Sequence, residues 1–380
     1  MNDKYYLTFA SILFLSTYIL IVPLWIVNLS FVFIIVFSTN KIKVPVSIIL
    51  LFTASYLNST IDINGDIGNY QYLYDNIFNN NVTYEFNSEP VIIYIFKLFN
   101  LINLDFRSVL FIQSLSFNLI MLFVSIKLLG NRGLNYFAIL MIFPPYIQMG
   151  LYLYRQSLGV VIFLFAVCLQ NNATKVSFFI LSILSHSASL FYISLVLIKD
   201  KCSKYIDFKF LMLILLLLLF FPIKNEFITW LLSMLKGFSY EINRKVDFFL
   251  RDDISSTFSL FSTIIIPLHA LYLYVLLYFF KNKNVKVNAF LFIFLMVYLF
   301  ILLTRNFSFL PTRFGLIVIM LGPIFFGGVL ESYKNRNYIY FHSFFVFFVM
   351  VSFVRFVIIN DVGNNNISFL NNNMFYFNML

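Results

Sequence analysis

A hydrophilic interruption between two apolar segments carries residue types suited to sugar chemistry. Residues 58–90 contain five carboxylates and no Lys or Arg. Carboxylates can accept or donate protons, so Asp66 is the first candidate for a general base and Glu89 the second. Three tyrosines at alternate positions add flat aromatic faces for sugar rings: Tyr70, Tyr72 and Tyr74. The stretch predicts one wall of a carbohydrate site.

Arginines at the starts of apolar segments supply the complementary charge. Arg155 and Arg313 each stand where the chain is predicted to enter a helix from the same side as residues 58–90. A helix N-terminus together with a guanidinium binds phosphate oxygens well, which predicts a pyrophosphate site. Arg305 is a further candidate at a helix end. Each of these arginines could instead extend to the membrane surface or pair with a loop carboxylate.

His186 lies between two serines in a segment that is basic at both ends, Lys175 and Lys199. A single span would place four lysines on the outer side, so the charge bias favours a broken pair of half-helices turning at 185–187. This turn would bring His186 toward the outer leaflet, with Ser185 or Ser187 capping the next helix. His186 is then either a packing residue or a third candidate base.

No metal or nucleotide motif accompanies these residues. The three histidines and two cysteines have no ligand spacing, and neither a phosphate-binding loop motif nor a dinucleotide fingerprint occurs. The sequence therefore predicts chemistry without a metal or cofactor. The net charge of +10 does not indicate a nucleic-acid partner, because the basic residues lie between apolar segments rather than in one stripe.

Composition assigns the fold class. Hydrophobic residues make up 61% of the 380 residues and charged residues 11%, which predicts an all-α polytopic integral membrane protein. Apolar runs cover residues 5–22, 24–38, 44–57, 91–104, 108–128, 134–150, 156–169, 176–198, 210–222, 258–280, 287–303, 314–330 and 338–359. We expect about 11–13 transmembrane or re-entrant helices. The run 91–104 is short, contains Lys97 and is better interpreted as interfacial or re-entrant.

The distribution of Lys and Arg predicts the orientation of a single membrane domain, 1–380. With residues 58–90 outside, 15 basic and four acidic residues lie on the inner side, together with the N-terminus. A second, charged outer loop, 224–257, could cover the site. The Asn-rich tail, 360–380, has no chemistry that we can assign.

Short motifs in a fixed order give the chain a resemblance to a known family. They are Gly65-Asp66 with Gly68 and Tyr70, Glu89-Pro90, Arg155-Gln156, His186-Ser187 and Arg313-Phe314. In their order and membrane placement they resemble the EpsG family of Wzy-type polysaccharide polymerases, and together they span most of the chain.

The resemblance implies a bacterial cytoplasmic-membrane enzyme that acts on polyprenyl-pyrophosphate-linked oligosaccharides at the outer face. Asp66, Glu89 or His186 would take the proton of the acceptor hydroxyl. The tyrosines at 70, 72 and 74 would contact sugars. The pyrophosphate would contact four residues: Arg155, Gln156, Arg305 and Arg313. Membrane lipid and a chain-length regulator are further candidate partners.

Two other functions remain open at this point. A flippase for the same lipid-linked unit should carry charges on both access paths and inverted repeats, whereas we find no internal repeat and the candidate charges lie toward one face. A membrane glycosyltransferase that adds one sugar from a lipid phosphate donor differs in product length. The sugars, the linkage, the stereochemical outcome and the polymer class, whether O-antigen, capsule or exopolysaccharide, do not follow from the sequence.

Overall fold

The computed structural model describes most of the first half of the chain and several later helices. The described residues are 22–60, 63, 66–79, 89–152, 154–202, 213–215, 217–218, 229–230, 233–234, 243, 246–247, 285–304, 314–332, 343, 346–355 and 357. Every regular element within them is helical, which confirms the all-α prediction for this part of the chain. Contacts divide the chain into two compact units, Met1–Ser187 with Arg336–Leu380 and Ala188–Asn335. Each unit is described by itself.

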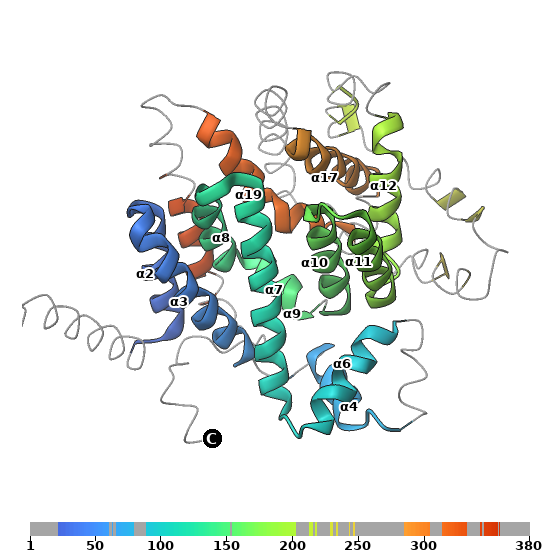
Figure 1. The fold of residues 1–380 in the computed structure, drawn as a ribbon, viewed down its shortest axis with the longest axis horizontal. Coiled ribbons are helices and arrows are strands. Elements are labelled where there is room, and N and C mark those ends of the chain that lie inside the picture. Colours follow the sequence, from blue (N-terminus) through green and yellow to red (C-terminus); the bar gives the residue numbers. More distant parts are fainter. Residues whose placement is uncertain are drawn as a thin grey trace, which may run out of the picture. The chain divides into compact units, whose positions relative to one another are not determined.

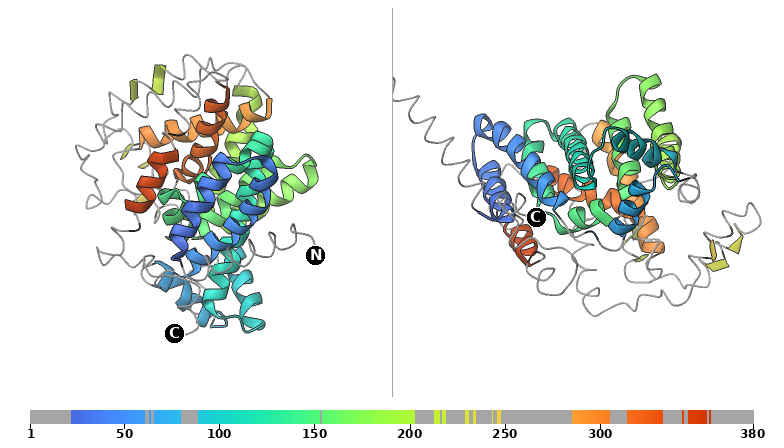
Figure 2. Two further views of the ribbon diagram at one scale, coloured as in Figure 1. Left: turned by 90° about the vertical axis from the view of Figure 1, so that its left-hand side faces the viewer. Right: turned by 90° about the horizontal axis from the view of Figure 1, so that it is seen from below.

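Four apolar helices form the body of the first unit (Figure 1): α2 (Leu24–Phe37), α3 (Asn40–Ser59), α7 (Phe106–Leu129) and α8 (Gly133–Met141). Both views of Figure 2 show α2 beside α3. Large apolar side chains such as Phe33 and Phe52 are about half exposed on this body, as expected for contact with lipid. Among the described helices, Asn40–Ser59 and Phe106–Met141 are long and apolar enough to cross a membrane. The total number of spans stays a prediction.

Two prolines divide the apolar run 134–150, which was expected as one segment. The helix α8 ends at Met141, and a separate helix, α9 (Pro144–Tyr152), begins two residues after Ile142. Pro144 and Pro145 occupy the first helical positions, where the missing backbone N–H has no intrahelical partner to lose. The helix α10 (Tyr154–Cys168) follows almost at once. The single-segment interpretation of 134–150 is therefore wrong.

Side-chain hydrogen bonds tie α9 to α3 and α7. The Asn118 amide donates to the Ser55 hydroxyl (2.9 Å), and its carbonyl accepts from the Tyr146 hydroxyl (2.8 Å). Asn58 donates to Ser114 (3.0 Å) one turn away. All five side chains are buried. In a membrane protein such groups pair with one another because lipid offers them no partner, so the network holds the first turn of α9 against α3 and α7.

The turn between α7 and α8 depends on a close backbone approach at Gly133. A Cβ atom at this position would lie 2.2 Å from the carbonyl oxygen of Ser125 in α7. Only glycine fits without moving one helix relative to the other.

We predict that Gly133→Ala lowers the midpoint of thermal unfolding in detergent micelles. Overpacking against a backbone atom costs about 1–3 kcal/mol. Gly150→Ala is the matched control, because no atom of another described segment lies within 4 Å of its added Cβ. Equal midpoints for the two variants would contradict the close approach.

The hydrophilic stretch 58–90 contains more regular structure than a loop. Residues Asp66–Asp75 form the helix α4, and Pro90 opens a second helix, α6 (Pro90–Leu101). At 12 residues, α6 is too short to span a bilayer alone, in agreement with the short segment expected there. Asp105 caps the N-terminus of α7, where hydrogen bonds from the hydroxyl and backbone of Ser108 hold the pKa of Asp105 below its ordinary value.

The segment 176–198 is broken, as the charge distribution predicted. The helix α11 (Asn172–Ser185) ends at His186, and α12 (Ser189–Cys202) begins three residues later in the second unit. The hydroxyl of Ser185 donates back to the Leu181 carbonyl (2.8 Å). The Ser185 hydroxyl is thus engaged within α11, and Ser187, the other serine expected to cap the next helix, stays a prediction.

The described core of the second unit is built from α12, α17 (Val285–Leu303) and α19 (Leu316–Ser332). Phe191 packs against the rings of Phe300 and Phe314, and the Tyr192 hydroxyl donates to the Phe314 carbonyl (3.1 Å). These contacts fix α12 against the segment that enters α19.

Candidate active site

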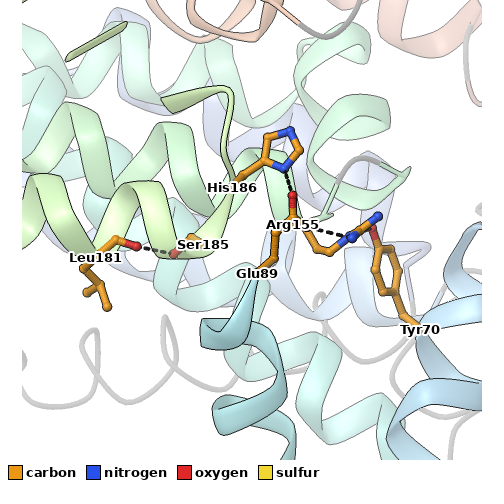
Figure 3. Close-up of polar contacts among 6 residues, drawn as sticks. All are labelled: Tyr70, Glu89, Arg155, Leu181, Ser185 and His186. Atoms are coloured by element: carbon orange, nitrogen blue, oxygen red, sulfur yellow. Dashed lines mark hydrogen bonds and ion pairs between the residues drawn. The ribbon is translucent and has the colours of Figure 1, made fainter. Parts of the chain in front are cut away.

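Glu89 connects three segments of the first unit that are far apart in sequence (Figure 3). Its carboxylate accepts a hydrogen bond from Nη1 of Arg155 (2.6 Å) through Oε2, and its Oε1 pairs with Nδ1 of His186. The side chain of Glu89 is only 6% exposed, against 14% for His186 and 32% for Arg155. A carboxylate, a guanidinium and an imidazole thus form one buried polar cluster, which we call the Glu89 cluster.

Helix ends place these side chains together. Glu89 is the residue before α6, whose first position is fixed by Pro90. Arg155 lies in the first turn of α10, and His186 is the C-cap residue of α11 in extended conformation. A helix terminus presents a side chain beyond the packed body of the bundle, which suits a site at the edge of an apolar region.

The packing of α10 against α11 explains why Arg155 and His186 meet. The hydroxyl of Ser182 donates to the Gly159 carbonyl (2.7 Å), and both residues lie at the interface of the two helices. Arg155 comes four residues before Gly159, and His186 four residues after Ser182. In two antiparallel helices these offsets reach the same end of the pair, about one turn beyond the contact. The backbone N–H of His186 donates to the Ser182 carbonyl (3.0 Å), which holds it there.

Tyr70 supports Arg155 from α4. Its hydroxyl oxygen lies 3.4 Å from Nε of Arg155, and its ring meets the ring of Tyr154 edge to face, with centroids 5.5 Å apart. Tyr70 and Glu89 therefore hold the guanidinium of Arg155 in place through Nε and Nη1, respectively. The Arg155 side chain as a whole is 32% exposed, so it is not closed off from an anion.

An aromatic core beneath the site joins the four helices that carry it. The ring of Tyr154 stacks on those of Phe96 in α6 and Phe117 in α7. Tyr74 of α4 packs on Phe96 and on Phe106 at the start of α7. Ring contacts of this kind are worth about 0.5–1.5 kcal/mol each beyond burial. The core fixes α4, α6, α7 and α10 relative to one another.

The three tyrosines of α4 do not share one face. Tyr70 and Tyr74 are 9% and 3% exposed, whereas Tyr72 is 61% exposed. Residues four apart lie on the same side of a helix and residues two apart do not, so helix formation separates Tyr72 from its neighbours. Burial raises the pKa of the Tyr74 hydroxyl, which donates to the Leu104 carbonyl (2.6 Å). Tyr74 thus holds the helices together, and Tyr72 presents its ring.

The structure brings four of the predicted site residues together: Tyr70, Glu89, Arg155 and His186. Asp66 begins α4, but its side chain lies outside the described part, as do Arg305 and Arg313. Gln156 is 4% exposed, and its Nε2 has no hydrogen-bond partner among the described residues. Sequence reasoning missed Tyr154, whose ring packs between the site and the aromatic core. Its position next to the candidate Arg155 was the one available signal.

The charges in the Glu89 cluster balance. Arginine keeps its proton in proteins, and a buried carboxylate bonded to it stays ionised. The pair is therefore neutral as a unit, with the imidazole beside it. Among the described residues, no three His, Cys, Asp or Glu side chains gather to hold a metal ion. The arrangement offers Arg155 as a cation that can bind an anionic group, and it offers Glu89 and His186 as groups that can take part in proton transfer.

A comparison with protein families covers the part of the chain that contains the Glu89 cluster. A family model described as the EpsG family matches residues 41–374, a range that contains every residue of the Glu89 cluster. No curated protein and no solved structure matches the chain.

Proposed function

The chain belongs to the EpsG family, and on this premise we propose that it is a polysaccharide polymerase of the cytoplasmic membrane. It transfers a growing glycan from polyprenyl pyrophosphate onto an incoming lipid-linked repeat unit at the outer face. The helical, apolar character of the described residues agrees with a membrane protein.

The observation that carries the proposal is the partly exposed side chain of Arg155 in the first turn of α10, whose guanidinium is held by Glu89 and Tyr70. Cleavage of a glycosyl pyrophosphate builds negative charge on the departing phosphate oxygen. A fixed guanidinium and the positive end of a helix stabilise that charge in place, without reorganising during the reaction. The site is therefore suited to a lipid-pyrophosphate leaving group.

The reaction also needs a proton acceptor. The acceptor hydroxyl oxygen bonds to the anomeric carbon while the bond from that carbon to the pyrophosphate oxygen breaks, and the electron pair leaves with the pyrophosphate. The hydroxyl proton passes to a base. The Glu89 cluster places a carboxylate and an imidazole next to the guanidinium that binds the leaving group.

The distribution of charge along α7 supports an outward-facing site. The aromatic core under the site contacts the Phe106–Phe117 half of α7, whereas Lys127 and Arg132 follow at its other end. The 24 residues of α7 extend about 36 Å, which matches the thickness of a bilayer. With the basic end inside, the site faces outward. The cytoplasmic N-terminus is proposed separately, from the distribution of Lys and Arg along the sequence.

Other residues complete the proposed site from the sequence. Arg305, Arg313 and Gln156 are proposed as further contacts to the pyrophosphate, and Tyr72 as the exposed ring for a sugar face. Asp66 is a second candidate base. A chain-length regulator is the proposed protein partner.

Deletion of the gene should make lipid-linked single repeat units accumulate at the outer face, with no ladder of longer glycans on a gel. A plasmid copy of the wild-type gene should restore the ladder. Units retained on the cytoplasmic side would instead identify a flippase, and units short of one sugar would identify a single-sugar transferase. Either result would overturn the proposal.

A further inference from the structure

We infer that Glu89 is a positioning residue that fixes the tautomer of His186, and that Nε2 of His186 is the atom that takes the proton from the acceptor hydroxyl. The inference that the proton comes from a sugar hydroxyl rests on the proposed function. The tautomer of His186 is independent of that function, because it follows from the geometry of the Glu89 cluster alone.

The two oxygens of Glu89 have separate partners. Oε2 accepts from the permanently charged Arg155, so the buried carboxylate stays ionised and acts only as an acceptor. The other oxygen, Oε1, faces Nδ1 of His186. Two acceptors cannot bond to each other, so Nδ1 must carry the hydrogen.

This hydrogen bond determines what the other ring nitrogen can do. A neutral imidazole has one N–H, so protonation of Nδ1 leaves a lone pair on Nε2. Figure 3 shows Nε2 on the side of the ring away from Glu89, and Nε2 makes no hydrogen bond within the described part of the chain.

Glu89 is poorly placed to accept the proton itself. Its side chain is 6% exposed, and both of its oxygens are already engaged. Approach to a sugar hydroxyl would break the contact to Arg155 or to His186. In known catalytic triads, a carboxylate orients a histidine base and is not itself protonated. Glu89 and His186 have the same relation here.

The sequence makes a direct spectroscopic test practical, because the whole chain contains three histidines. In the full-length protein labelled with ¹⁵N-histidine and reconstituted in lipid, the His186 signal is assigned by its loss in His186→Gln. We expect His186 to carry its proton on Nδ1 when neutral, and Glu89→Ala to shift it toward the Nε2-protonated form. Unchanged signals from the other histidines show that the variant is folded. An Nε2-protonated wild type would overturn the inference, whatever reaction the protein catalyses.

Variants in a polymerisation assay test the consequence for catalysis. Glu89→Gln keeps one carbonyl acceptor for Nδ1 and should retain more activity than Glu89→Ala, which should fall about 10²-fold or more. If Glu89 acts through His186, the double variant of Glu89→Gln with His186→Gln should be no slower than His186→Gln alone. Near-normal activity of His186→Gln, with an inactive Glu89→Gln, would identify Glu89 as the base instead. Absence of any polymer from wild type would refute the proposed function and leave the ¹⁵N result to decide the tautomer.

Discussion

Replacing Arg155 with alanine should abolish long-chain polymer while single repeat units still reach the outer face. The guanidinium contacts Glu89, and the Arg155 side chain is partly exposed. Loss of a preorganised charge-stabilising donor costs about 10²–10³ in rate, and loss of a full charge should cost at least as much. Gel analysis of lipid-linked glycans in a deletion strain that carries the variant measures the effect.

Arg155→Lys separates catalysis from folding in this experiment. The alanine variant also leaves the buried carboxylate of Glu89 without its cation, which is destabilising by itself. Lysine retains the charge but lacks the planar fork, so the variant should fold and make shorter or fewer chains. Normal chain lengths in Arg155→Ala would contradict the assignment of this residue.

Replacing His186 with glutamine should lower the maximal rate while substrate binding is nearly preserved. General-base catalysis contributes about 10²–10⁴-fold, and glutamine can accept a hydrogen bond but cannot take a proton at neutral pH. Steady-state rates of the purified protein in lipid, with a lipid-linked repeat unit as substrate, separate kcat from KM.

His342→Gln is the control for His186→Gln. It makes the same substitution at a residue that the sequence predicts to lie near a cytoplasmic helix end, away from the proposed site, so both kinetic parameters should match those of wild type. A His186 variant with unchanged kcat and a raised KM would show that the imidazole only binds substrate.

The sequence predicted the residue types at the site better than their arrangement. Apolar runs and the distribution of lysines led to an all-helical membrane protein with a break at 186, since both follow from local composition. The central position of Glu89 did not follow. Glu89 is 66 residues from Arg155 and 97 from His186. No local sequence pattern predicts contacts between residues so far apart in the chain.

Helical periodicity explains the other differences. Tyr70, Tyr72 and Tyr74 would share one face of an extended segment, but α4 buries two of them and exposes the third. The polar composition of the stretch obscured the helix, because only Ile67 and Leu73 join the two tyrosines on its buried side. In the run 134–150, the prolines were visible, yet a hydropathy pattern alone gives them no weight.

The adjacency of Tyr154 and Arg155 limits how this chain can change in length. Successive residues of a helix point about 100° apart, and here one direction leads into the aromatic core and the next into the Glu89 cluster. A single inserted or deleted residue at the start of α10 would turn the guanidinium toward the rings and a ring toward the carboxylate. Loops elsewhere can lengthen at little cost, whereas this junction can change by substitution but not by a shift of register.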